Sequence, residues 1–442
     1  MSITAIVLAA GQGSRMNSDR PKVLHEIGGV PMLGHALSAV EVAGAERVVV
    51  VAGVGAEQVE RALTGLSPDA SVVRQTEQLG TAHAVLAARE ALADATGQAL
   101  VIYGDTPFIR PETFEAMLEA RATHDVVVLG FEAADPGRYG RLVTEGDTLL
   151  RIVEFKDATD EERAITLCNS GVVCADVEKL MALAGAVGNA NASGEYYLTD
   201  IVGLAREQGL SATVVRCDEA ETLGVNTRAE LAAAEAAFQS RKRAQALEDG
   251  VSLAAPETVY FAPDTVIGRD ALVEPNVVFG PGVTVESGAR IRAFSHLEGC
   301  HVSRGATVGP FARLRPGAEL SEDVHVGNFV EIKNATVGEG AKVNHLTYIG
   351  DADIGARTNI GAGTITCNYD GYGKAKTVIG EGAFVGSNSS LVAPVEIADG
   401  AYVGSGSVIT KDVPKDALSV ARGRQVTKDG WAAAFRAKHQ KD

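Results

Sequence analysis

A spacing of six residues between apolar side chains constrains the fold of the C-terminal half more than any other feature. The register runs through Ile267, Val273, Phe279, Val285, Ile291 and Leu297, resumes one residue out of step at Val302, and continues with short slips to Ile409. A period of six matches neither the 3.6 of a helix nor the 2 of an alternating strand. It is typical of a solenoid, in which each repeat points one aliphatic residue inward and stacked coils bury what one coil cannot.

The N-terminal half has a different texture, in which β-branched runs alternate with helical stretches. Strands are predicted at Ile3–Leu8, Arg47–Ala52, Leu100–Tyr103 and Asp125–Gly130, and helices at Met32–Ala43, Thr81–Ala95 and Pro111–Ala122. This order predicts a parallel sheet covered on both faces, with ligands at the carboxyl ends of its strands. Residues 228–248 contain neither Gly nor Pro and predict a connecting helix. We therefore expect domains at 1–227 and 249–442, joined by a helix at 228–248.

Composition excludes several classes of protein. The 442 residues carry a net charge of −17, which disfavours nucleic acid and anionic membranes as partners. The five cysteines are scattered and include no CxxC pair, so neither a zinc cluster nor a disulfide framework is expected. No apolar run reaches the roughly 18–20 residues of a membrane span, and no basic segment precedes the first strand. These features predict a cytoplasmic protein.

The first predicted strand leads into a loop suited to phosphate. After Leu8 the chain reads AAGQGSR, and small residues let backbone N–H groups approach a triphosphate closely. Arg15 and Lys22 could neutralise the charge on phosphate oxygens. The same residues are also compatible with an ordinary glycine turn that carries two solvated surface cations. Asp105 follows the buried run LVIYG, where a carboxylate could hold Mg²⁺ or simply cap a turn.

The six-residue pattern is interrupted between Ile360 and Ile379 by a loop that carries Asn368 and Tyr369. An unusual cluster of polar residues precedes this loop: Arg313, Arg315, Glu331, Lys333, His345 and Tyr348. His345 has the right chemistry to take a proton from an amine that attacks a thioester, and we expect Glu331 to orient it. A lone histidine on a solenoid is more often a surface residue, and the solenoid itself could be only a scaffold. Cys367 is an alternative nucleophile, but no base motif accompanies it.

Two motifs resemble known families. The segment LAAGQGSRM…PKVL resembles the signature of sugar-nucleotide pyrophosphorylases, and the repeats resemble left-handed parallel β-helix acyltransferases. In this order they resemble the bacterial bifunctional N-acetylglucosamine-1-phosphate uridyltransferase/glucosamine-1-phosphate N-acetyltransferase family. The resemblance implies an α/β Rossmann-like nucleotidyltransferase domain followed by a left-handed β-helix.

The resemblance also implies the chemistry. Acetyl-CoA would acetylate glucosamine-1-phosphate in the C-terminal domain. UTP and Mg²⁺ would then convert N-acetylglucosamine-1-phosphate to UDP-N-acetylglucosamine and pyrophosphate in the N-terminal domain, supplying peptidoglycan and lipopolysaccharide precursors. A homotrimer with active sites between neighbouring copies is implied as well.

Site residues follow from the same resemblance. In the uridylyl site it implies Arg15 and Lys22 as catalytic residues and Asp105 and Asn226 as Mg²⁺ ligands. Contacts with nucleotide and sugar are implied for Leu8, Ala9, Ala10, Gly11, Gln75, Gly80, Thr81, Tyr103, Gly104, Gly140, Glu154, Asn169 and Asn226. In the acetyl site it implies His345 and Glu331 as catalytic residues, Arg315 and Lys333 as the residues that hold the sugar phosphate, and Tyr348 and Asn359 as further contacts around the substrate. Coenzyme A contacts are implied for Ala362, Asn368, Tyr369, Ser387, Ser405 and Arg422.

Two other interpretations remain open from the residues. One is a different sugar-1-phosphate nucleotidyltransferase with a regulatory β-helix, and the polar cluster around His345 argues against it. The other is a non-enzymatic assembly subunit that keeps both folds. Such a subunit has little reason to retain Arg15, Lys22, Asp105 and Asn226 together.

Overall fold

The computed structural model describes residues 2–439. The chain divides into two compact units, 1–238 and 239–442, so the division falls inside helix α8 (Arg228–Glu248), which occupies the predicted helical segment. No helix among the described residues is long and apolar enough to span a membrane.

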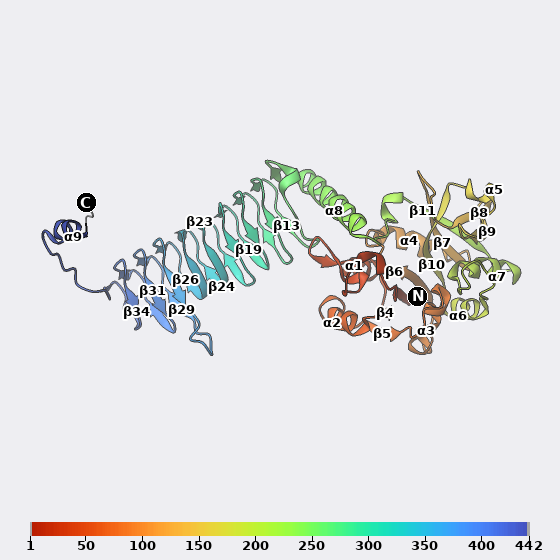
Figure 1. The fold of residues 1–442 in the computed structure, drawn as a ribbon, viewed down its shortest axis with the longest axis horizontal. Coiled ribbons are helices and arrows are strands. Elements are labelled where there is room, and N and C mark those ends of the chain that lie inside the picture. Colours follow the sequence, from red (N-terminus) through yellow and green to blue (C-terminus); the bar gives the residue numbers. More distant parts are fainter. Residues whose placement is uncertain (1, 440–442) are drawn as a thin grey trace. The chain divides into compact units, whose positions relative to one another are not determined.

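The first unit is built on a mixed sheet with strand order β11-β7-β10-β6-β1-β4-β5 (Figure 1). Its strands are β1 (Ile3–Ala9), β4 (Arg47–Ala52), β5 (Ser71–Arg74), β6 (Gln98–Tyr103), β7 (Val126–Glu132), β10 (Leu167–Asp176) and β11 (Ala212–Cys217). The four predicted strands are present, but the all-parallel prediction is wrong at β10, which runs antiparallel to both β6 and β7. The hairpin β8 (Arg141–Glu145) and β9 (Thr148–Val153) reverses the chain before β10 and produces this orientation.

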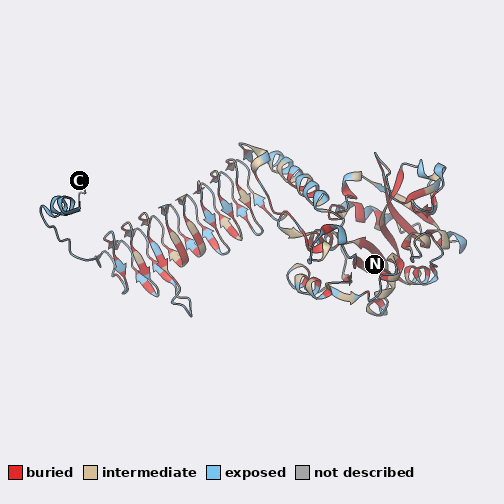
Figure 2. Ribbon diagram, viewed as in Figure 1, coloured by how far each residue is buried: buried red, intermediate tan, exposed pale blue. Residues whose placement is uncertain are grey.

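Helices cover both faces of this sheet, as predicted. Alternate residues of β1 enter opposite cores: Ala5 and Val7 on one side, Ile6 and Leu8 on the other. The first face packs against α1 (Met32–Val42), α2 (Ala56–Leu66) and α4 (Pro111–Ala120), and the second against α3 (Thr81–Ala87), α6 (Val177–Ala186) and α7 (Ile201–Glu207). Figure 2 shows the strands as the buried layer of the unit. Helix α3 is shorter than the predicted Thr81–Ala95 and is followed by a 3-10 turn at Glu90–Leu92.

The second unit is a left-handed parallel β-helix with three faces. One face consists of β12 (Ser252–Leu253), β14 (Leu272–Val273), β17 (Arg290–Ile291), β20 (Thr307–Val308), β23 (His325–Asn328), β25 (Lys342–His345), β27 (Asn359–Ile360), β30 (Phe384–Val385), β33 (Tyr402–Val403) and β35 (Leu418–Ser419). A second consists of β13 (Val266–Ile267), β16 (Thr284–Val285), β19 (Cys300–Val302), β22 (Ala318–Leu320), β29 (Thr377–Ile379) and β32 (Val395–Ile397). The third consists of β15 (Val278–Phe279), β18 (His296–Leu297), β21 (Arg313–Leu314), β28 (Ile365–Cys367), β31 (Ser390–Val392) and β34 (Val408–Ile409). The longer strands β24 (Glu331–Val337) and β26 (Tyr348–Ile354) turn the corner and contribute to the second and third faces.

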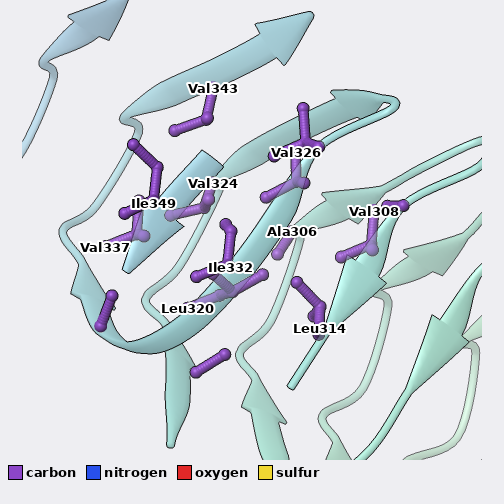
Figure 3. Packing of buried hydrophobic residues seen from close by; sticks show 14 of the residues in the cluster. Ala306, Val308, Leu314, Leu320, Val324, Val326, Ile332, Val337, Val343 and Ile349 are labelled. Atoms are coloured by element: carbon purple, nitrogen blue, oxygen red, sulfur yellow. The ribbon is translucent and has the colours of Figure 1, made fainter. Parts of the chain in front are cut away.

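Strand pairing explains the six-residue period. Leu272 pairs with Arg290, eighteen positions further on, so one coil holds three repeats of six. The predicted inward residues form one continuous core, and all except Ile267 are at most 3% exposed. Figure 3 shows Val308, Leu314 and Leu320 on successive strands pointing into this interior.

A second inward position lies two residues before each periodic one, which the sequence analysis did not identify. Small or β-branched residues occupy it, among them Ala271, Val283, Ala306, Ala318, Val324 and Ala341. Their size fits the narrow corners of the coil.

Candidate functional sites

Lys22 lies at the centre of a polar group formed by distant segments of the first unit. Its Nζ contacts the Asp105 carboxylate and donates a hydrogen bond of 2.9 Å to Oδ1 of Asn226. Asp105 follows β6, and Asn226 precedes α8. Parallel pairing of β1 with β6 places Leu8 opposite Tyr103, and the Val225 amide donates to the Asp105 carbonyl oxygen at 3.1 Å. These backbone contacts bring three of the four predicted charged or metal-binding residues together.

A cavity of about 330 Å³ opens beside Lys22 at the carboxyl ends of β1 and β6. The predicted residues that line it are Leu8, Ala9, Ala10, Gly11, Lys22, Gln75, Gly80, Thr81, Tyr103 and Asp105. Gly104 is buried next to it and donates its amide to the Leu8 carbonyl oxygen at 3.0 Å. Arg15 does not line the cavity; its exposed side chain makes no hydrogen bond or ion pair with any described residue.

One end of the cavity is shaped by the segment 75–81. The buried Gln75 donates from Nε2 to the Gly80 carbonyl oxygen at 3.2 Å. Gly80 has φ +123°, and a Cβ there would lie 2.5 Å from the backbone oxygen of Tyr196, so this position requires glycine. Gln78, which the sequence analysis missed, donates to the Ala10 carbonyl oxygen at 3.0 Å and ties this segment to the phosphate loop.

The predicted sugar contacts also lie together. The Asn169 amide donates to the Gly140 carbonyl oxygen at 2.9 Å, and a Cβ on Gly140 would lie 3.4 Å from Oε1 of Glu154. Burial raises the pKa of Glu154, and the nearby Asp200 and Asp157 charges add to this, although a hydrogen bond from Thr199 opposes it. The Oγ1 of Thr199 donates to Glu154 at 3.3 Å and is a further member of the group that sequence reasoning missed.

Tyr103 connects this group with the Lys22 cavity. Its ring packs so closely on Gly171 that a Cβ there would lie 2.5 Å from the ring. Burial raises the pKa of Tyr103, and the charges of Asp105 and then Glu154 raise it further. Both carboxylates therefore act on the same phenol.

The donor set at Lys22 fits Mg²⁺. The carboxylate of Asp105 and the amide oxygen of Asn226 converge on one cation, the Lys22 ammonium, and Mg²⁺ prefers such oxygen ligands. Among the described residues there is no group of three or more His, Cys, Asp or Glu side chains suited to a metal. A metal here would therefore complete its coordination with substrate phosphates and water.

In the second unit, three cations gather near the interruption of the repeats. Arg315 donates a hydrogen bond of 2.7 Å to Glu331, the first residue of β24. Lys333 is the next outward-pointing residue of the same strand. The neighbouring Lys374, followed by Arg315, lowers the pKa of Lys333. Lys374 comes from the hairpin between β28 and β29, which projects from the coils in Figure 1, and sequence reasoning missed it. Three positive side chains in one place can bind a phosphate.

Asp351 links this cation group to the hairpin. Asn334 donates to one of its carboxylate oxygens at 2.5 Å, and Asn368 donates to the other. Burial alone would raise the pKa of Asp351, but these amides and the charges of Lys374 and Lys333 hold it below its usual value. Of the two predicted hairpin residues, Asn368 is thus held in the body, whereas Tyr369 is exposed.

His345 forms no hydrogen bond or ion pair with Glu331, so the structure does not show the orienting contact that the sequence analysis expected. The Nδ1 of His345 lies 3.0 Å from Oδ1 of Asn328, its neighbour one coil earlier, whereas Glu331 is engaged by Arg315. The cause is the corner of the coil: His345 ends a strand of one face, and Glu331 begins a strand of another. Because an amide oxygen only accepts, Nδ1 carries a proton, so in the neutral form of the ring the lone pair is on Nε2.

Four of the six predicted coenzyme A contacts lie in one file that starts at His345, whereas Asn368 and Tyr369 belong to the hairpin after β28. Ala362, Ser387 and Ser405 each lie two positions after an inward residue of the same sheet, as His345 does. Arg422 ends the file, with its Nη1 donating to the Ser405 carbonyl oxygen at 2.5 Å. With about 4.8 Å per strand, the four steps from His345 to Arg422 span about 19 Å.

The structure separates two predicted sugar contacts. Tyr348 pairs with Glu331 on the third face, close to Arg315 and Lys333. Asn359 is an outward residue of β27, in the sheet of a different face. Within one chain Asn359 therefore does not join the cation group.

Family models match both units. Residues 5–170 match the MobA-like NTP transferase domain, and residues 264–299 and 376–411 match the bacterial transferase hexapeptide, described as six repeats. Relatives named "Bifunctional protein GlmU" match almost the whole chain. Two strains of Cereibacter sphaeroides have relatives 71% and 69% identical, each over 98% of this chain and 95% of the relative, and a Jannaschia relative is 60% identical over 99% and 96%.

The chain belongs to the GlmU family. GlmU relatives match both halves in one alignment, which accounts for two transferase domains in a single chain. This agrees with the bifunctional family that the sequence motifs resemble, and it disfavours a β-helix that is only regulatory.

Proposed function

We propose that this chain, as a bifunctional transferase, synthesises UDP-N-acetylglucosamine in two steps. The β-helix domain, residues 249–442, transfers acetyl from acetyl-CoA to glucosamine-1-phosphate. The domain at 1–227 then transfers uridylyl from UTP to N-acetylglucosamine-1-phosphate, and the helix at 228–248 connects the two domains. The observation that carries the proposal is the convergence of Lys22, Asp105 and Asn226 beside the phosphate loop, because it assembles a charge-neutralising site from three separate segments.

In uridylyl transfer, a phosphate oxygen of the sugar attacks the α-phosphorus of UTP. A new oxygen–phosphorus bond forms as the bond to the departing pyrophosphate breaks, so no covalent enzyme intermediate is needed. Lys22 and the exposed cation of Arg15 neutralise the phosphate oxygens, and the backbone N–H groups after β1 orient the triphosphate. Mg²⁺ held by Asp105 and Asn226 would supply further charge neutralisation on the phosphates. Gln75 and Gly80 would read the uracil edge, and Gly140, Glu154 and Asn169 the sugar.

In acetyl transfer, the amine of the sugar attacks the thioester carbonyl carbon. Nε2 of His345 accepts the proton that the amine loses, and the departing thiolate of coenzyme A takes up a proton. Arg315, Lys333 and Lys374 hold the sugar phosphate. The file from Ala362 to Arg422 holds the extended arm of coenzyme A, with Arg422 at its 3′-phosphate.

A cytoplasmic homotrimer is part of the proposal. Asn359 lies on a different face from Lys333, so it can reach a sugar bound at Lys333 only in a neighbouring copy. Light scattering with simultaneous activity measurement tests this. A fully active monomer would contradict it.

The decisive experiment incubates the purified chain with glucosamine-1-phosphate, acetyl-CoA, UTP and Mg²⁺. We expect UDP-N-acetylglucosamine, identified by mass spectrometry. Product should vanish when acetyl-CoA is omitted and return when N-acetylglucosamine-1-phosphate is supplied instead. A nucleotidyltransferase with a regulatory β-helix would form product only from the acetylated sugar and would release no free coenzyme A.

A further inference from the structure

Arg228, in the first turn of α8, contacts the segment that follows the phosphate loop at two points. Its Nε donates to the Met16 carbonyl oxygen at 3.2 Å, and its Nη1 lies 3.2 Å from Nδ1 of His25. Met16 directly follows Arg15 and is 1% exposed; His25 follows Lys22 by three residues and is 4% exposed. The guanidinium of Arg228 therefore contacts the chain close to Arg15 and Lys22, the two proposed catalytic cations.

The chemistry of the His25 contact is fixed by its partner. A guanidinium only donates hydrogen bonds, so Nδ1 of His25 must accept and the ring is neutral. Burial lowers the pKa of His25, and the charges of Arg228 and Arg20 lower it further, which favours this neutral state. The His25 amide donates to the Lys22 carbonyl oxygen at 3.2 Å, so the ring is tied directly to the turn that carries Lys22.

The helix that carries Arg228 is itself anchored. Glu235 accepts a hydrogen bond of 2.7 Å from the Gly28 amide, in the short hairpin of β2 (Glu26–Ile27) and β3 (Val30–Pro31). Phe238 packs so closely on Gly28 that a Cβ there would lie 2.4 Å from its ring. Asn226 lies only two residues before Arg228, so it shares this anchored end of the helix.

We propose that Arg228, with His25 as its acceptor, is a positioning residue that fixes Asn226 relative to Lys22 in the uridylyl site. The inference rests on the proposed function of that site. Lysine cannot replace Arg228, because one ammonium lacks the planar pair of donors that reaches the Met16 carbonyl oxygen and the His25 ring together. Without the contacts of Arg228 with Met16 and His25, the loop separates from the helix, although the residues that touch substrate are themselves unchanged.

The test compares Arg228→Lys, His25→Leu and His25→Asn. The amide oxygen of asparagine can stand where Nδ1 of histidine stands, so His25→Asn keeps the acceptor that His25→Leu removes. Arg243→Lys is the matched control: Arg243 is also on α8 and also donates to a backbone oxygen, that of Val259, but its partners belong to the second unit. Each variant is assayed for both transfers and for Mn²⁺ binding with UTP present, measured by electron paramagnetic resonance.

We expect Arg228→Lys and His25→Leu to lower uridylyl kcat about tenfold or more and to weaken Mn²⁺ binding, because small displacements of positioned groups are costly. Acetyl transfer should persist, and His25→Asn and Arg243→Lys should resemble the unchanged chain. Normal Mn²⁺ binding and kcat in Arg228→Lys would overturn the inference, as would equal losses in His25→Asn and His25→Leu. Joint loss of both activities with a lower Tm would also overturn it, because it would indicate a purely structural role. An unchanged chain that performs acetyl but not uridylyl transfer would overturn the proposed function together with the inference.

Discussion

The ammonium of Lys22 and the carboxylate of Asp105 form an ion pair although 83 positions separate them in the chain. Their side chains are only 12% and 18% exposed, so each charge is stabilised by the other, and removing one would leave the other largely buried without its partner. The pairing of β1 with β6 produces this contact, because it aligns the loops that follow the two strands. The same pair faces the cavity where a triphosphate would bind.

Replacing either partner should strongly and selectively slow uridylyl transfer. We expect Lys22→Ala and Asp105→Ala to reduce its kcat by about 10²–10³, the usual cost of removing one preorganised electrostatic group. Acetyl transfer should persist, and separate assays of the two half-reactions measure both. Lys179→Ala, which breaks the Lys179–Asp125 ion pair elsewhere in the unit, is the control. Parallel loss of both activities in a folded Lys22→Ala protein would refute the assignment of two sites.

The sequence predicted the β-helix well because its period is a direct consequence of coil geometry. Each residue from Val273 to Ile409 in the predicted register enters the core, since one coil always returns after three repeats. The inward positions occupied by Ala271 or Ala306 were missed because small residues carry little hydrophobic signal. The antiparallel β10 was missed for another reason: orientation depends on the β8–β9 hairpin, not on the strand's own composition.

The site was predictable only in part, because many contacts depend on tertiary structure. Residues at strand ends, such as Asp105, could be selected from the sequence. Gln78, Lys374 and Asn328 could not, because ordinary loop polar residues become relevant only through contacts with Ala10, Lys333 and His345. The expected contact between Glu331 and His345 is not formed in this chain because a corner of the coil separates the two residues.

Asn328 should matter for acetyl transfer because it holds the imidazole of His345. We expect Asn328→Ala to lower acetyl kcat about tenfold with little change in KM, since the ring loses the acceptor that fixes its tautomer. Steady-state kinetics with varied glucosamine-1-phosphate separate the two parameters. Exposed Thr336 on β24 supplies the control, Thr336→Ala. A rise in KM alone would show that Asn328 acts on substrate binding instead.

Two substitutions distinguish the proposed general base, His345, from the alternative nucleophile, Cys367. His345→Ala should reduce acetyl transfer by about 10²–10⁴, the usual contribution of a general base. Cys367→Ala should retain activity, because no hydrogen bond among the described residues joins its Sγ to a base. Rates are measured by release of free coenzyme A. An inactive Cys367→Ala protein that folds normally, together with ping-pong kinetics, would establish an acyl-enzyme route.

Glu154 should make the stability of the first unit depend on pH. Its folded pKa lies above the ordinary value of about 4.3, so the stabilisation is present below that value and is lost as pH rises through the folded pKa. Glu154→Gln has no charge to bury. Its Tm relative to the unchanged chain should therefore rise as the pH increases above about 4, as measured by calorimetry. The exposed Glu115→Gln should show no such trend, and a constant Tm difference for Glu154→Gln would contradict the prediction.

Arg422 allows the proposed coenzyme A contacts to be tested by comparing acetyl-CoA with a ligand that lacks only the 3′-phosphate. If its guanidinium contacts the 3′-phosphate, Arg422→Ala should raise KM for acetyl-CoA about fivefold, because an exposed charge pair contributes about 1 kcal/mol. Acetyl-3′-dephospho-CoA lacks that phosphate, so the variant and the unchanged chain should use it equally well. The expected ratio of KM values is therefore about five with one ligand and about one with the other. Exposed Arg424 supplies the control, since Arg424→Ala removes the same charge two residues away. Equal effects of Arg422→Ala on both ligands would place the 3′-phosphate elsewhere and leave Arg422 a purely structural contact of the Ser405 carbonyl oxygen.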